Sequence, residues 1–274
     1  QHDGEPEEVA QAMSEQYLPR FAGDQLPESN TGIVLALAER IDTIVGLFGI
    51  GQPPTGSKDP YALRRAALGI LRIIVEKELP LDLASCINNA ISHFSDLPET
   101  DNLDHSVLDF IFDRFRAWYA DEGISANIFL AVDAVRTSNP LDFDLRIKAV
   151  NQFSTMPEAE ALSIANKRVS NILAKLDQQP SADIDSSLLT EAAEIQLAKK
   201  LSALLVEVKP LLEKNHYSRA LTAMATLQKD VDSFFDEVMV NTDDELIRNN
   251  RQSLLQQLRH LFLQIADISL LQSS

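Results

Sequence analysis

The sequence predicts an all-α protein. Apolar residues recur every three or four positions through nearly every segment, which is the spacing of amphipathic helices. Leu, Ala, Glu and Gln are abundant, whereas glycine contributes only 9 of 274 residues, and this mixture favours helices over strands. No segment shows a convincing strand pattern, and no internal repeat is visible.

One clearly bounded helix is predicted from about residue 31 to residue 48. Its apolar residues share one face, and Asn30 or Thr31 can cap its start. Gly49 and Gly51 end it, because the proline-rich stretch that follows cannot continue a helix.

The next helix is predicted over 60–77. Asp59 before Pro60 places an N-cap residue ahead of a proline at the first helical position, which is a strong start signal. Further helices are predicted at about 80–94, 103–121, 125–136, 142–152, 157–176, 188–213, 217–239 and 244–267.

Two domains are expected from the length of the chain. The segment Thr155-Met156-Pro157 interrupts the helical pattern, so the division is placed between residues 1–154 and 155–274. Pro210 is expected to kink or end the helix that contains it.

The formal net charge of −17 argues against a uniformly phosphate-binding surface. The charge is segregated, however. Residues 58–77 carry five cations against two acids, and residues 246–266 carry three arginines and no acid, so each stretch has a net charge of +3. Residues 94–144 carry eleven acids against three arginines. This pattern permits local phosphate contacts on an acidic protein.

Cys86 is the only cysteine, so an intramolecular disulfide is excluded and a reducing compartment is indicated. No apolar run approaches the roughly 18 residues needed to span a membrane. The glycine-rich phosphate loops, the nucleophile elbow and the paired-cysteine motif are missing from the sequence.

A weak metal-site pattern lies at the start of the chain. His2 and Asp3, with Asp42 on a predicted helix, are ligand types found in HD-type metal phosphohydrolases, in which the metal activates water. The alternative interpretation is a solvated stub and an exposed carboxylate, and no metal site is favoured.

Basic side chains form a first candidate surface on the predicted helix 60–77. Arg64 and Arg72 are two turns apart and share a face, with Arg65 beside them, and the helix start adds partial positive charge. Arginine binds phosphate in a bidentate manner, so these residues are candidates for contacting an RNA backbone. Ion pairs to acidic helices of the same chain are the alternative.

Two further candidate surfaces lie in the second half. Lys167, Arg168 and Asn171 fall near one helix face, for which an ordinary amphipathic helix is the alternative. The predicted last helix carries a stripe of arginines three and eight residues apart, and the stripe is interpreted as facing phosphate. Its members are Arg248, Arg251 and Arg259.

Six blocks distributed from one end of the chain to the other resemble the C-terminal part of the β subunit of bacterial glycyl-tRNA synthetase. They are residues 17–24 (YLPRFAGD), 41–51 (IDTIVGLFGIG), 59–67 (DPYALRRAA), 114–119 (RFRAWY), 166–173 (NKRVSNIL) and 266–271 (ADISLL). Their combination is more specific than any single motif.

The resemblance implies a two-subunit, cytoplasmic enzyme of the α2β2 type that attaches glycine to its tRNA. The α subunit of such an enzyme holds the site for ATP, Mg²⁺ and glycine, so neither a catalytic residue nor a cofactor is expected in this chain. Residues 1–154 would be the HD-like part and the helices after it. Residues 155–274 would be an anticodon-binding helical bundle like that of arginyl-tRNA synthetase, and glycine tRNA and the α subunit would be the partners.

The sequence therefore leaves three functions open. The first is the tRNA-binding, non-catalytic part of the ligase. The second is an HD-type phosphohydrolase, although this family is not known for that hydrolysis and HD enzymes need more ligands than these three. The third is a purely structural scaffold for the α subunit.

Overall fold

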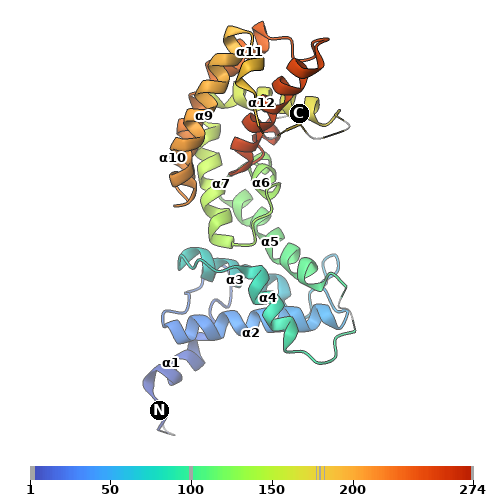
Figure 1. The fold of residues 1–274 in the computed structure, drawn as a ribbon. Helices are drawn as coiled ribbons and strands as arrows, with labels where there is room; N and C mark the ends of the chain where they lie inside the picture. Colours follow the sequence, from blue (N-terminus) through green and yellow to red (C-terminus); the bar gives the residue numbers. More distant parts are fainter. Residues whose placement is uncertain (1–3, 99–100, 177, 179, 182, 273–274) are drawn as a thin grey trace. The chain divides into compact units, whose positions relative to one another are not determined.

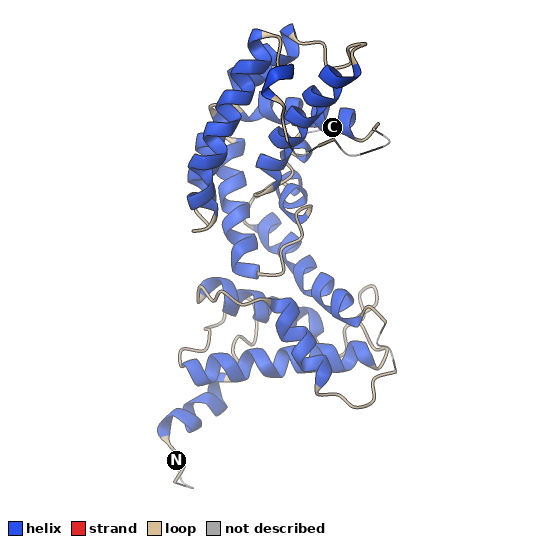
Figure 2. Ribbon diagram, in the orientation of Figure 1, coloured by secondary structure: helices blue, strands red, loops and turns tan. Residues whose placement is uncertain are grey.

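The protein is described by a computed structural model that covers residues 4–98, 101–176, 178, 180–181 and 183–272. Within these residues the chain forms twelve α-helices and two short 3-10 helices, and no strand occurs beyond an isolated bridge between Thr55 and Lys58 (Figure 2). The all-α prediction is confirmed. None of the helices in the described part of the chain is long and apolar enough to cross a membrane.

The chain forms two compact units. The first holds the described residues up to Gly123 together with Thr137–Asp144, and the second holds Ile124–Arg136 and the described residues from Leu145 onward. The backbone therefore passes between the units three times. The predicted division into residues 1–154 and 155–274 stays a prediction.

Helix α2 (Asn30–Gly49) is the central element of the first unit, because α1, α3, α4 and α5 all pack against it (Figure 1). Ile44 and Val45 of this helix are fully buried. The other helices are α1 (Glu7–Glu15), α3 (Leu63–Glu76), α4 (Leu83–Ser92) and α5 (Leu103–Asp121).

An aromatic cluster fills the core at the end of α5. The ring of Phe115 is fully buried and stacks on Tyr119 and on Phe143, with ring centroids 5.2 and 5.1 Å apart. Tyr119 donates a 3.1 Å hydrogen bond to Asp144, and burial together with this carboxylate raises the pKa of the phenol. Phe143 and Asp144 come from the first turns of α7 (Pro140–Ser154).

The second unit packs α9 (Ala192–Leu212) against α10 (Tyr217–Ala225) and α11 (Gln228–Glu237), while α8 (Ala159–Leu173) contacts α11 and α12 (Glu245–Leu263). These helices are labelled in Figure 1, except α8. Short elements complete the unit: α6 (Ala126–Asp133), η1 (Ser186–Leu188) and η2 (Ile268–Leu270).

Early helices hold the end of the second unit in place. Arg146 of α7 donates hydrogen bonds to the carbonyls of Gln264 and Ile265, at 2.6 and 2.9 Å. The amide of Asp267 donates to the carbonyl of Ala131 in α6, at 2.8 Å. The last turns of the chain therefore depend on residues more than a hundred positions earlier.

Several predicted helix boundaries are corrected by the structure. Ser29, not Asn30 or Thr31, caps α2, because its hydroxyl accepts from the amide of Gly32. Asp59 does accept hydrogen bonds at the start of α3, from the amides of Leu63 and Arg64. The helix nevertheless begins three residues after Pro60, because Ala62 has a left-handed backbone with φ 54° and ends a turn there.

The predicted helix 217–239 is two helices, α10 and α11, which end and begin on either side of Thr226 and Leu227. Lys200 of α9 donates to the carbonyl of Thr226 and pairs with Asp230, so it takes a carbonyl that a continuous helix would use internally. Pro210 lies inside α9, which ends two residues later at Leu212.

Candidate nucleic-acid interface

Helix α8 presents an exposed basic and polar face. Its buried face holds Leu162 and Val169 against the neighbouring helices, and the opposite face exposes Lys167 and Asn171, one turn apart. Within the described residues, neither of these two side chains makes a hydrogen bond or an ion pair to the rest of the chain. They are therefore available to a ligand.

Arg168, next to Lys167, is exposed but anchored. Its guanidinium lies over the ring of Phe235 in α11, 4.2 Å from the ring centroid. Such stacking holds the group in one orientation without neutralising its charge. The predicted α8 group of Lys167, Arg168 and Asn171 is thus brought together on the surface.

The predicted arginine stripe of α12 is not formed, because Arg251 lies inside the protein. Arg251 is only 5% exposed, and its guanidinium donates to both carboxylate oxygens of Glu194, at 2.8 and 3.2 Å. It also donates to Thr190 and to the carbonyl of Met239. This arginine joins the start of α9 to α12 and leaves no group for RNA.

Arg259 is also engaged within the protein. Its two Nη atoms donate to the two carboxylate oxygens of Asp267, at 3.2 and 2.7 Å. Asp267 in turn caps η2 by accepting from the amide and hydroxyl of Ser269. Arg259 therefore fixes the last turns of the chain.

Arg248 is the member of the stripe that stays partly accessible. Asp244 caps α12 by accepting from the amides of Leu246 and Ile247, and Arg248 folds back to donate to the carbonyl of Thr242 at 2.8 Å. It lines a hollow with a volume of about 840 Å³ between α12 and the segment that follows α8.

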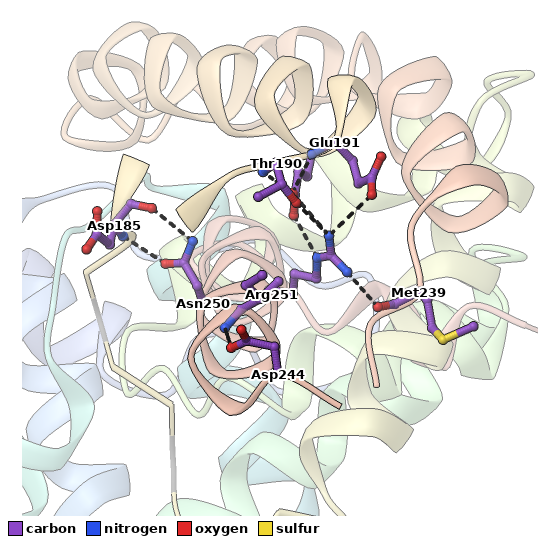
Figure 3. Close-up of polar contacts among 9 residues, drawn as sticks. Asp185, Thr190, Glu191, Met239, Asp244, Asn250 and Arg251 are labelled. Carbon is purple, nitrogen blue, oxygen red and sulfur yellow. Dashed lines mark hydrogen bonds and ion pairs between the residues drawn. The ribbon is translucent and has the colours of Figure 1, made fainter. Parts of the chain in front are cut away.

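The amide of Asn250 holds the far wall of this hollow. Its Oδ1 accepts from the backbone amide of Asp185 at 2.8 Å, and its Nδ2 donates to the carbonyl of the same residue at 2.9 Å (Figure 3). Asn250 is itself buried, so it ties the backbone of Asp185 to α12.

The lining of the hollow is polar and more acidic than basic, with Asp183, Asp185 and Glu245 against Arg248. Carboxylates and amides such as that of Asn249 accept from or bridge to the amino groups of bases, whereas phosphate would be repelled by the acids. The lining therefore suits hydrogen-bond donors such as the amino groups of base edges better than it suits phosphate.

The three candidate arginines on α3, in the first unit, differ in how they are engaged by the rest of the chain. Arg72 is held by Glu76, through Nε at 2.7 Å, and by the carbonyl of Asp24 at 3.1 Å. Arg64 donates to the carbonyl of Gly56 at 2.7 Å and is half-buried. Arg65 is exposed and, within the described residues, makes no ion pair.

Only one of the three candidate metal ligands lies in the part of the chain that the structure describes. His2 and Asp3 lie outside the described residues, and Asp42 is an exposed side chain of α2. Among the described residues no three His, Cys, Asp or Glu side chains gather closely enough to hold a metal ion.

Acid is expected to destabilise the second unit. Burial alone would raise the pKa values of Glu194 and Asp267, but hydrogen bonds from Arg251 and Arg259, respectively, with further donors, lower both. Because the folded pKa values lie below the unfolded ones, the contribution is fully present well above the unfolded values of about 4 and is lost as the pH falls below them toward the folded values. Urea titrations over this range test it. Asp267→Asn should give a shallower dependence, and an unchanged stability would contradict the expectation.

Sequence reasoning missed Glu194 and Asn250. A local signal existed for the first, since Glu191 and Glu194 form a reciprocal capping box at the start of α9. No local signal marks Asn250, because its partner lies 65 residues away in the chain.

Comparison with known proteins shows which families the chain resembles. A family model described as glycyl-tRNA synthetase beta subunit matches residues 1–134, and one described as DALR anticodon binding domain matches residues 162–271. The chain is 55% identical over 271 residues to the glycine–tRNA ligase beta subunits of Glaesserella parasuis and Mannheimia succiniciproducens, and 53% identical over 270 residues to that of Pseudomonas aeruginosa.

These matches cover 98–99% of this chain. The chain belongs to the glycyl-tRNA synthetase β-subunit family. It spans 39–40% of the length of these relatives.

Within this β-subunit chain, the span of the anticodon-binding model begins inside α8 and ends after η2. It therefore contains the exposed α8 group, the 840 Å³ hollow and the buried Arg251–Glu194 pair. The α3 arginines lie in the span of the other model.

Proposed function

We propose that this chain is the tRNA-binding part of a glycine–tRNA ligase β subunit. It supports the ATP-dependent attachment of glycine to its tRNA by the α subunit. The proposal is supported by the match of residues 162–271 to the anticodon-binding model, together with the exposed, unpaired basic group on α8 in that span.

In this proposal residues 155–274 bind the anticodon region. Lys167 and Arg168 contact phosphate, Asn171 extends the same face, and Arg248 lies at the edge of the adjoining hollow. Arg251 and Arg259 act indirectly, because they hold the helices that shape this surface. Residues 1–154 serve as an HD-like binding scaffold rather than a hydrolase.

The chain works in the cytoplasm beside an α subunit, in an α2β2 assembly, and ATP and Mg²⁺ are bound by that partner. No catalytic residue is assigned to this chain. Aminoacylation by the chain alone would therefore not be expected.

The double substitution Lys167→Glu and Arg168→Glu is expected to weaken binding of glycine tRNA by at least about tenfold at low salt, and to reduce the slope of log affinity against log salt by about 1 per lost phosphate contact. Both side chains are exposed, so the fold should be retained although the contact of Arg168 with the Phe235 ring is lost. Fluorescence anisotropy with labelled glycine tRNA at two salt concentrations measures both quantities.

Lys209→Glu, an exposed lysine of α9, is the matched control and should change affinity little. Glycine tRNA that binds the unaltered chain no more tightly than an unrelated tRNA would count against the proposal. Equal effects of the control and the α8 substitutions would show only a general charge effect.

A further inference from the structure

A second hollow, with a volume of about 370 Å³, lies on the surface of the first unit between the segment after α1, helix α2 and the start of α3. Its volume is in the range of small-ligand pockets. The side chains that give it chemical character are two tyrosines, three arginines and one acid: Tyr17, Tyr61, Arg20, Arg40, Arg65 and Glu39.

The two tyrosine rings are presented to solvent. Tyr17 is 65% exposed and Tyr61 is 54% exposed, and neither ring stacks on another aromatic ring of the described residues. Tyr61 belongs to the turn that Asp59 fixes at the start of α3. Both rings line the same hollow, so a planar ligand that enters it can stack on either of them.

Arg40 places a buried positive charge on the hollow. It is only 6% exposed, and its guanidinium donates to three backbone carbonyls, those of Gln16, Ala36 and Pro19, at 2.8–3.2 Å. No carboxylate of the described residues lies within ion-pair distance of it, and burial lowers the pKa of the group while Glu39 partly offsets this. A buried cation held only by neutral groups favours an anion nearby.

Arg65 adds an accessible cation at the same hollow. Arg20 is compensated by Asp24, at 3.1 Å, and Glu39 stands against the two remaining arginines. The local charge is therefore positive on a chain whose net charge is −17. Exposed aromatic rings beside arginines that leave a net positive charge are the combination with which proteins hold single-stranded nucleic acid.

We propose that this hollow binds one unpaired nucleotide, with its base stacked on Tyr17 or Tyr61 and its phosphate drawn to Arg65 and Arg40. An acidic peptide would use the arginines and leave the rings exposed, whereas a nucleotide uses both. A base within a duplex is already stacked on its neighbours and cannot enter. The nucleotide can be part of an RNA strand or free, since both carry the same base and phosphate.

The site is separate from the proposed anticodon-binding surface, which lies in the other unit. The two proposals can therefore fail independently. Substitutions on α8 test the first with glycine tRNA, and substitutions at the tyrosines test the second with a short oligonucleotide.

The test is the binding of a fluorescein-labelled single-stranded hexaribonucleotide to the whole 274-residue chain. Tyr17→Ala or Tyr61→Ala should weaken binding about 5- to 150-fold, the range for loss of one stacked base, while Tyr17→Phe and Tyr61→Phe should bind normally. Arg65→Ala should make the slope of log affinity against log salt shallower by about 0.7. Phe21→Ala, an exposed ring outside the hollow, is the matched control.

A hexaribonucleotide carrying 5-iodouridine supplies a second readout that does not require a folded variant. Photo-crosslinks to peptides containing Tyr17 or Tyr61 support the site, and displacement of the strand by AMP supports it with a free nucleotide as the source. Unchanged binding by both alanine variants, equal binding of the duplex form, or crosslinks confined to the second unit would overturn the proposal.

Discussion

Replacing Arg251 with methionine is expected to lower the free energy of unfolding of the second unit by about 3–5 kcal/mol. The guanidinium is buried against Glu194, which is itself 0% exposed, and the two share hydrogen bonds at 2.8 and 3.2 Å. Removal of the cation leaves the carboxylate in a low-dielectric environment without its partner, although the amides of Thr190 and Glu191 still donate to it. Chemical denaturation followed by far-UV circular dichroism measures the loss.

Trp118 supplies an internal reference for this experiment, because it is the only tryptophan and lies in the first unit. Its fluorescence transition should be unchanged in Arg251→Met. The double variant Arg251→Met with Glu194→Leu should lose less than the sum of the two single variants, since it removes both charges. A loss below about 1 kcal/mol, similar to that of the exposed control Arg219→Met, would show that the pair is not a structural anchor.

Phe115→Ala is expected to destabilise the first unit by about 3–5 kcal/mol. The ring is fully buried and contacts Phe112, Trp118, Tyr119 and Phe143, so its removal leaves a cavity in the densest part of the aromatic cluster. Trp118 is one of its neighbours, and its fluorescence reports the transition directly.

A control variant in the same unit shows which outcome would contradict this expectation. Phe21→Ala removes an exposed ring of the same unit and should change the free energy of unfolding by less than about 0.5 kcal/mol. If Phe115→Ala behaved like this control, the stacked rings could not be the main support of the link between α5 and the start of α7.

The helices could be predicted from the sequence because each buries one face, and burial imposes a period of 3.6 on the apolar residues. Helix α5 was predicted at the residues where it occurs. The errors fall where a distant group decides the local structure. The predicted helix 217–239 is interrupted at Thr226 and Leu227, where Lys200 donates to the carbonyl of Thr226, and nothing near Thr226 in the sequence reveals that contact.

The prediction of the candidate site was limited in the same way, by contacts between residues that are distant in the sequence. Spacing correctly placed Lys167 and Asn171 on an exposed face, because an apolar stripe fixes which side of α8 turns inward. Spacing could not foresee the fate of Arg251, since its partner Glu194 lies 57 residues earlier in the chain. An arginine on a polar helix face is equally suited to phosphate or to an internal carboxylate, and only the fold decides between them.

The backbone crosses between the two units three times, and this limits how the protein can be cut into separate pieces. A recombinant piece limited to residues 162–271 would omit Arg146 and Ala131, and with them the hydrogen bonds that secure Gln264, Ile265 and Asp267. The second unit is thus discontinuous along the chain, although its anticodon-binding span is continuous. A stable excised version would have to begin at or before residue 124, and it would carry residues 137–144 away from the unit to which they belong.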